Sequence, residues 1–388
     1  MASGLWKPNK VLGRISRIVC LAFLVSIDCL VAAPALALAP QSENPSVLFI
    51  NPGRTGEVFW EMVSGFMTAA AQDLDLDLKI VLAERDHLKM IELANEAAQS
   101  DNPPDYMILV NEKLAAGRML EEIPSSIKLI FLNNTLSEEQ VRQLGKPRQI
   151  ASNWIGHIFP DHEKAGYDIA RSIIVAQKSS VDGAVDKPGL LAIGGNQATM
   201  ASILRVNGMQ RALQESPEIE LYQTIHSQWR RDKAESQMFG LIRRWPGTRL
   251  IWAANDPMAL GAMDAAILRG RKPGKDVFIG GLNWSTEALE RILDGKITAS
   301  LGGHFMQGGW AMVMIHDYHK GADFIDLGTE FTAPMAIIDR SNVTQYLNIL
   351  GGQNWNRIDF TQFVRGHPDN IERYHFDLDT ILKQFEKQ

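Results

Sequence analysis

TRLIWAANDPMALGA, residues 248–262, contains the clearest fold signal in the chain. Its first six residues end in the apolar run at 250–253 and have the length of a buried strand. Pro257 follows closely, and proline suits the first turn of a helix because the N–H that it lacks would have no partner there. Asp256, directly before it, belongs to the residue types that cap helix N-termini. The stretch therefore predicts a strand, a short polar turn and a helix.

The same alternation of apolar runs and amphipathic segments extends along the chain in both directions and restarts after a loop at 178–188. Strands are expected at 46–51, 78–82, 105–110, 128–132, 149–154, 190–193, 218–225, 248–253, 276–280 and 297–301, with a late extended segment at 330–338. Helices are expected at 88–98, 165–175, 199–213, 232–243 and 305–316. This order predicts parallel sheets with right-handed crossovers. We therefore predict an α/β fold of two Rossmann-like lobes. Ligands bind at the carboxyl ends of such strands, so a ligand cleft is expected between the lobes.

The first residues look like a cleavable export signal. Four basic residues precede an apolar run at 18–31, which ends in an alanine-rich track. These parts predict a signal peptide at 1–37, cleaved near Ala37 or Ala39, and a protein located in the periplasm. Cleavage after Ala37 is favoured because the later cut would leave Pro40 at the new terminus. The alternative interpretation is an uncleaved membrane anchor.

The cysteine count and the charge restrict the function further. Cys20 and Cys29 are the only cysteines, and both lie inside the expected leader. The formal net charge is −6 although the leader itself is basic, so the rest of the chain is more acidic still. An acidic chain without a basic run lacks the electrostatic footprint of a nucleic-acid partner. We therefore expect an exported part with no thiol chemistry and no bound nucleic acid.

Polar and aromatic side chains follow the predicted strands at the points where they end, and these positions should converge on one edge of each sheet. Planar amides and carboxylates make paired hydrogen bonds to adjacent hydroxyls, arginine offers a rigid fork of donors, and an aromatic face covers the C–H face of a sugar-like ring. At each position a turn or helix-cap role is the alternative. The candidate ligand-binding residues are Thr55, Glu57, Phe59, Trp60, Asn111, Asn134, Arg205, Trp229, Arg231, Asn255 and Asn283.

Several motifs resemble the type I periplasmic binding proteins, in the ribose- and galactose-binding class. The segment 254–262 is close to the family pattern A-x-N-D-x-M-A-L-G-A, and Phe59-Trp60 and Arg205-x-x-Gly208 match other family positions. The Leu132–Asn134 segment is more similar to the branch that contains the autoinducer-2-binding receptor. The resemblance implies two lobes joined by three hinge strands, with crossovers near His157, Gly303 and Ala333, and closure on the ligand. The implied N-terminal lobe is 40–157 plus 304–332. The implied C-terminal lobe is 158–303 plus 333–388, including a C-terminal extension from 351.

The resemblance also implies roles at matching positions. Phe59 and Trp60 match the aromatic pair that stacks on the ligand, while Asn134, Arg205, Asn255 and Asn283 match polar ligand positions. The chain departs from the family where sugar binders usually carry an Asp-Arg pair (Asn133-Asn134), an acid (Asn283) and a glutamine (Gly303). These departures argue against ribose and autoinducer-2. Two hypotheses for Glu57 are an ion pair with Arg205 across the closed cleft and a contact with an amino group of the ligand.

Taken together, these features predict a solute-binding protein that captures a sugar or sugar-like molecule and delivers it to an ABC importer. The alternative is a receptor that signals to a membrane histidine kinase or chemoreceptor. An enzyme is not expected, because no G-x-S-x-G nucleophile is present and no cysteine remains after cleavage. No metal or cofactor is expected either: His316 and His319 form an H-x-x-H without a third ligand. We expect a monomer.

Overall fold

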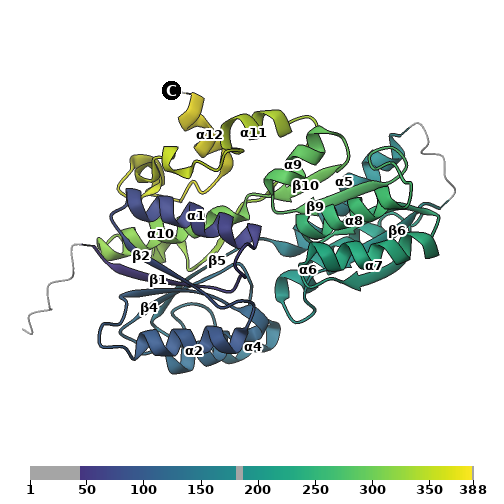
Figure 1. Ribbon diagram of the computed structural model, residues 1–388. Coiled ribbons are helices and arrows are strands. Elements are labelled where there is room, and N and C mark those ends of the chain that lie inside the picture. The colour runs from purple at the N-terminus through teal and green to yellow at the C-terminus, as the bar shows by residue number, and fades with distance from the viewer. Residues whose placement is uncertain (1–43, 181–186, 387–388) are drawn as a thin grey trace, which may run out of the picture. The chain divides into compact units, whose positions relative to one another are not determined.

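The computed structural model describes residues 44–180 and 187–386 (Figure 1). The chain divides into two units, residues 1–41 and 42–388, and all the helices and strands of the described residues belong to the second. The predicted signal peptide and its cleavage site lie outside the described residues. Among the described residues, none of the helices combines the length and apolar character that crossing a bilayer requires.

Two six-stranded sheets form the cores of two lobes. In the first lobe the strand order is β11-β5-β4-β3-β1-β2, and in the second it is β12-β10-β9-β8-β6-β7. All neighbours are parallel except β10 and β12, which pair antiparallel. The order of the first five strands in each lobe is the doubly wound 2-1-3-4-5 order, whose ligand crevice lies between the first and third strands. The predicted fold class of two Rossmann-like lobes is confirmed.

The first lobe consists mainly of the N-terminal part of the chain. Its elements are β1 (Ser46–Asn51), α1 (Val58–Asp73), β2 (Asp77–Leu82), α2 (His87–Ala98), β3 (Tyr106–Val110), α3 (Ala116–Glu122), β4 (Lys128–Leu132), α4 (Glu138–Leu144) and β5 (Trp154–Phe159), and later α10 (Gln307–His319) and β11 (Glu330–Thr332). Strands β3 and β4 are almost wholly buried because helices cover both faces of the sheet, which explains their uninterrupted apolar sequences.

The second lobe repeats this plan. It contains α5 (His162–Lys178), β6 (Gly189–Gly194), α6 (Met200–Gln214), β7 (Glu220–His226), α7 (Arg231–Arg244), β8 (Thr248–Ala253), α8 (Asp256–Leu268), β9 (Phe278–Leu282), α9 (Thr286–Leu293), β10 (Ala299–Gly302), β12 (Ala336–Asp339) and α11 (Val343–Leu350). Residues 248–262 form β8 and the start of α8, with Asn255 as the N-cap and Asp256 as the first helical residue. The expected cap is therefore one residue earlier than the sequence suggested.

Two predicted strands differ from those in the structure. The fifth was expected at 149–154 but begins at Trp154, because residues 149–152 are partly or fully exposed whereas Trp154–Phe159 is an apolar, mostly buried strand. The late extended segment at 330–338 is two strands in different sheets. β11 pairs with β5 in the first lobe, and β12 pairs with β10 in the second. Pro334 lies between them, where no ladder N–H is needed.

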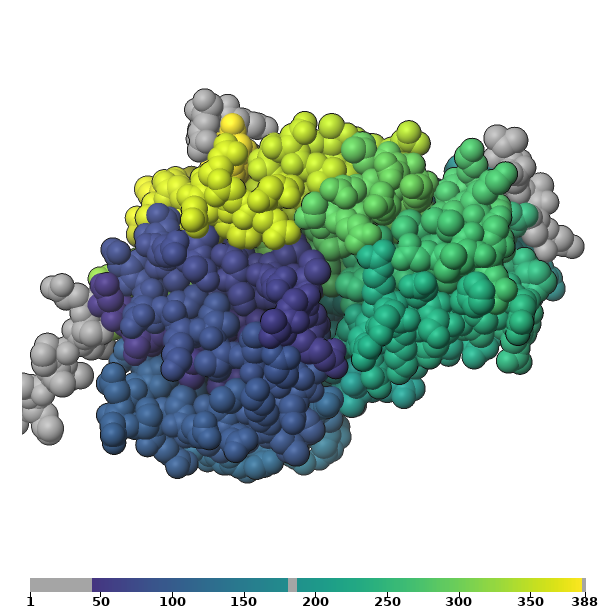
Figure 2. Space-filling model, in the orientation of Figure 1, coloured from purple at the N-terminus to yellow at the C-terminus, as the bar shows by residue number. Residues whose placement is uncertain are grey.

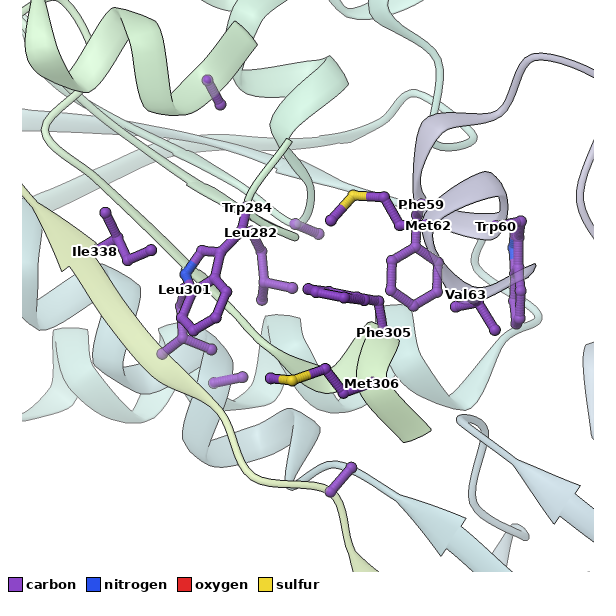
Figure 3. Close-up of a cluster of buried hydrophobic side chains, with 14 of the residues drawn as sticks. Phe59, Trp60, Met62, Val63, Leu282, Trp284, Leu301, Phe305, Met306 and Ile338 are labelled. Atoms are coloured by element: carbon purple, nitrogen blue, oxygen red, sulfur yellow. The ribbon is translucent and has the colours of Figure 1, made fainter. Parts of the chain in front are cut away.

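Three chain crossovers connect the lobes, after β5, after β10 and between β11 and β12. His157 lies inside β5, so the first crossing follows Phe159 rather than His157. Gly303 is in the left-handed region, with φ of 104°, where glycine has no steric penalty. In Figure 3, Phe305 and Met306 lie between α1 side chains such as Val63 and second-lobe side chains such as Leu282. The second crossover is thus embedded in a hydrophobic cluster shared by both lobes.

The C-terminal extension packs on the first lobe, whereas the sequence placed it with the second. α11 contacts α9 of the second lobe, and the chain then passes Gly351 and Gly352 to reach α1. Trp355, Phe360 and Phe363 are buried there. Figure 2 shows the C-terminal residues, in yellow, over the purple N-terminal residues. The remaining tail, which includes α12 (Leu378–Glu386), follows from this anchored segment, so residues 351–355 form a fourth connection between the lobes.

Candidate functional site

A cavity with about 480 Å³ of empty space, including its open mouth, lies between the carboxyl ends of the two sheets. Residues that follow β1, β2, β3 and β4 line it from the first lobe, and residues that follow β6, β7, β8 and β9 line it from the second. This is the crevice that the strand order defines. The lining residues are Glu57, Phe59, Trp60, Arg85, Glu112, Asn133, Asn134, Thr199, Ala201, Arg205, Trp229, Asn255, Pro257 and Asn283.

Aromatic side chains form opposite parts of the wall. Phe59 and Trp60, on the first turn of α1, meet edge to face with ring centroids 5.0 Å apart. Trp229, after β7 in the second lobe, is half-buried and has a positive φ of 66°. The indole N–H groups of Trp60 and Trp229 are buried and have no hydrogen-bond partner among the described residues. Both rings combine an apolar face with an available donor.

The first-lobe part of the wall contains a buried cluster of charges. Arg85 Nε donates to Glu57 Oε2 at 2.9 Å, and its Nη1 donates to Glu112 Oε1 at 3.3 Å. Burial acts to lower the pKa of Arg85, but the Glu112 and Glu57 carboxylates outweigh it and hold the pKa above its ordinary value. Glu57 therefore pairs with an arginine of its own lobe. The hypothesis of a Glu57–Arg205 pair across the cleft is wrong for this structure.

Arg205, on α6, is the buried cation of the second lobe. It donates from Nη1 to the Ala254 carbonyl at 2.8 Å, from Nε to His162 Nδ1 at 3.3 Å and from Nη2 to His304 Nε2 at 3.2 Å. The face of the Trp229 ring lies 5.7 Å from its guanidinium carbon. Burial lowers the pKa of Arg205 to about 9, against the opposing charge of Asp256.

Both histidines turn one ring nitrogen toward this guanidinium. His162 Nε2 donates to the Asn133 carbonyl at 2.9 Å, which leaves Nδ1 to accept from Arg205. Burial, reinforced by the positive charge of Arg205, lowers the pKa of both His162 and His304 well below the usual value. Helix α5 approaches α6 this closely because residue 166 is glycine: a Cβ there would lie 1.9 Å from the Arg205 carbonyl oxygen.

Asn133 and Asn134 end β4 at the junction of the lobes. Asn133 has a left-handed φ of 66°, which asparagine tolerates, and Gln307 bonds to both its backbone N–H and its side chain. Asn134 donates to Glu112 Oε2 at 3.3 Å and accepts from the Ala201 N–H of α6, also at 3.3 Å. Asn134 thus links the first-lobe charge cluster to the second lobe.

Two asparagines that follow second-lobe strands have different surroundings. Asn255 caps α8 by accepting from the Met258 N–H at 2.9 Å and donates to the Trp229 carbonyl at 3.1 Å, so both ends of its amide are engaged. Asn283 is buried, has a φ of 128°, and makes no side-chain hydrogen bond to another described residue. Its amide is therefore available to a ligand in the cavity.

Three predicted residues lie outside the cavity lining. Thr55 is exposed and bonds to Glu84. Asn111 is fully buried and bonds to Gln140, the Thr135 carbonyl and the Ala116 N–H, which fixes the turn after β3. Arg231, at the start of α7, pairs with Asp264 and Glu287. The other eight predicted residues line the cavity.

The lining also contains residues that were not among the candidates: Arg85, Glu112, Asn133, Thr199, Ala201 and Pro257. Arg85 and Glu112 come shortly after the ends of β2 and β3. The expectation that binding residues follow the ends of strands therefore applies to them as well. Thr199 and Ala201 lie at the start of α6. Nothing about their side chains indicates from the sequence that they line the cavity.

The fold and this inter-lobe cavity define a two-lobed α/β binding protein. The periplasmic binding protein domain model matches residues 47–323, and the chain belongs to this family. A solved structure of a periplasmic sugar-binding protein from Pseudomonas fluorescens is 40% identical, with a TM-score of 0.79, and the match covers 87% of this chain and 99% of that one.

Curated relatives match shorter regions. A galactofuranose-binding protein of Escherichia coli (strain K12) is 25% identical over 115 residues, or 29% of this chain and 36% of that protein. A D-apiose import binding protein of Paraburkholderia graminis is 23% identical over 188 residues, or 46% of this chain and 58% of that protein. The chain thus spans less than two thirds of the length of these curated relatives.

Proposed function

We propose that the protein is a periplasmic solute-binding protein that captures a sugar or sugar-like molecule between its lobes and delivers it to an ABC importer. The observation that carries the proposal is the composition of the cavity wall, where aromatic faces and hydrogen-bonding groups from both lobes line one cavity. The ligand residues proposed are Glu57, Phe59, Trp60, Asn134, Arg205, Trp229, Asn255 and Asn283. Asn255 and Asn134 contribute mainly by positioning their neighbours.

Family membership and the descriptions of related proteins support this function. The 40% identical relative is described as a sugar-binding protein, and another relative as an import binding protein. The receptor alternative stays a prediction that no observation here favours. Genes for a permease and an ATPase beside this gene would support import, and a kinase gene would support the receptor.

A thermal-shift screen of the purified protein against sugars, polyols and furanones tests the proposal. A ligand at 100 times its Kd adds about 2.7 kcal/mol to the unfolding free energy, which raises the melting temperature by several degrees. We expect such a shift with at least one sugar-like compound. If no compound of these classes stabilises the protein, the proposal is contradicted.

A further inference from the structure

The charge on Arg205 is not neutralised by a directly bonded carboxylate. The side chain is buried, at 3% exposure, and no described carboxylate lies within ion-pair distance of it. Its acceptors are one carbonyl and two imidazole nitrogens. A guanidinium has five N–H groups, so two of them, one on each terminal nitrogen, remain without a partner.

The second-lobe wall has no acid that could take these two donors. Its lining residues are Thr199, Ala201, Arg205, Trp229, Asn255, Pro257 and Asn283. Asp256 is near enough to influence Arg205, but its carboxylate oxygens accept from Ser285 and Ser300. This half of the cavity therefore presents a positive charge and hydrogen-bond donors.

The two acids of the first-lobe wall share one arginine of that lobe, Arg85, and neither pairs with Arg205. Glu57 accepts from Arg85 and from the Arg54 N–H. Glu112 accepts from Arg85 through one oxygen and from Asn134 through the other. Every oxygen of these two carboxylates has at least one donor in the protein, and their remaining lone pairs are what the first-lobe wall offers to ligand hydroxyls.

The two unpartnered N–H groups of Arg205 find no carboxylate in the second-lobe wall. The indole N–H groups of Trp60 and Trp229 are also buried and unpaired among the described residues, and the lining residue Asn283 has a free side-chain amide. Burying a cation without an opposite charge is unfavourable. A carboxylate supplies that charge and can accept two parallel hydrogen bonds from a guanidinium. We propose that the ligand is a sugar acid whose carboxylate binds Arg205.

This inference rests on the proposed function and specifies its ligand class. The experiment titrates the purified protein calorimetrically at pH 7.5 with pairs that differ in one carboxylate: D-galacturonate and D-galactose, D-gluconate and D-glucitol, L-arabinonate and L-arabinitol. We expect the acid to bind at least tenfold more tightly than its neutral partner in at least one pair. Equal or tighter binding of the neutral partner in every pair that binds overturns the inference and leaves the proposed function intact.

A substitution can place a carboxylate in the second-lobe wall, which also contains Arg205, and so test this inference. Asn283→Asp adds a carboxylate to the second-lobe wall with almost no change of shape, and Asn354→Asp makes the same change at an exposed residue outside the cavity. We expect Asn283→Asp to weaken binding of the acid at least tenfold more than binding of its neutral partner, while Asn354→Asp changes neither. Unchanged acid binding by Asn283→Asp overturns the inference. If the wider screen and all pairs give no binding to the wild-type protein, the proposed function fails and the inference fails with it.

Discussion

Asn134 Oδ1 accepts a hydrogen bond from the Ala201 N–H across the cleft, at 3.3 Å. Ala201 is in the first turn of α6, where N–H groups have no intrahelical partner, and the N-cap residue Thr199 makes no side-chain cap. A first-lobe side chain therefore caps a second-lobe helix. This bond forms only when the lobes are together, so it stabilises the closed cleft.

Asn134→Ala should consequently weaken ligand binding without unfolding the protein. One hydrogen bond contributes about 0.5–1.5 kcal/mol, so we expect Kd to rise roughly two- to tenfold in calorimetric titration. Ala201→Pro removes the same N–H and serves in a double-mutant cycle. If the bond acts as described, the double variant is no weaker than the worse single variant. Fully additive effects would contradict the capping role.

Arg85 should be the strongest stability determinant in the first-lobe wall. Arg85→Met leaves Glu57 and Glu112 facing each other without a cation, and breaking a buried pair costs about 3–5 kcal/mol of unfolding free energy. Urea unfolding measures this loss. Combining Arg85→Met with Glu57→Gln and Glu112→Gln should restore most of the stability. A loss below about 1 kcal/mol for Arg85→Met alone would contradict the description of the cluster.

Stability should fall as the pH drops from about 6.5 to about 4. Burial lowers the pKa of His157 to about 4, and the pKa values of His162 and His304 are lowered as well. The unfolded chain therefore binds protons in this range that the folded chain excludes, and His157 alone accounts for about 3 kcal/mol. Asp256, whose pKa burial raises to about 6, acts in the opposite direction but is a single group.

Urea midpoints at several pH values test this slope. His157→Gln retains a donor for the Asn134 carbonyl and removes the titration, so it should lose less stability between pH 6.5 and 4.5 than the wild-type protein. Identical slopes for the two proteins would show that His157 does not titrate as its burial requires.

The C-terminal extension should contribute to the stability of the first lobe. Phe360 is fully buried and packs against Phe66 and Trp310, so Phe360→Ala should reduce the unfolding free energy by about 3–5 kcal/mol. Ile371→Ala, at an exposed residue of the same tail, should change it by less than about 0.5 kcal/mol. A small effect at Phe360 would mean that the tail is not anchored on α1 and α10.

Much of the fold could be predicted because most of the parallel strands are short apolar runs followed by a helix. The expectation that binding residues follow the ends of strands also identified most of the predicted residues that line the cavity, including Arg205 and Asn283. It failed at Thr55 and Arg231 because position along the chain does not give side-chain direction: each pairs with an acid outside the cavity. The tail's aromatic residues indicated packing but not which lobe they contact, because that depends on the path of the chain after Leu350.

Comparing two arginines of the second lobe tests whether the ligand binds in the cavity between the lobes. Arg205 lines the cavity and Arg231 does not, and each hydrogen bond to a charged group is worth about 1.5–3 kcal/mol. With the compound that gives the largest thermal shift, we predict in calorimetric titration that Arg205→Gln raises Kd about 100-fold and that Arg231→Gln leaves it unchanged. Full affinity in Arg205→Gln, or loss of affinity in Arg231→Gln alone, would contradict the proposed inter-lobe site.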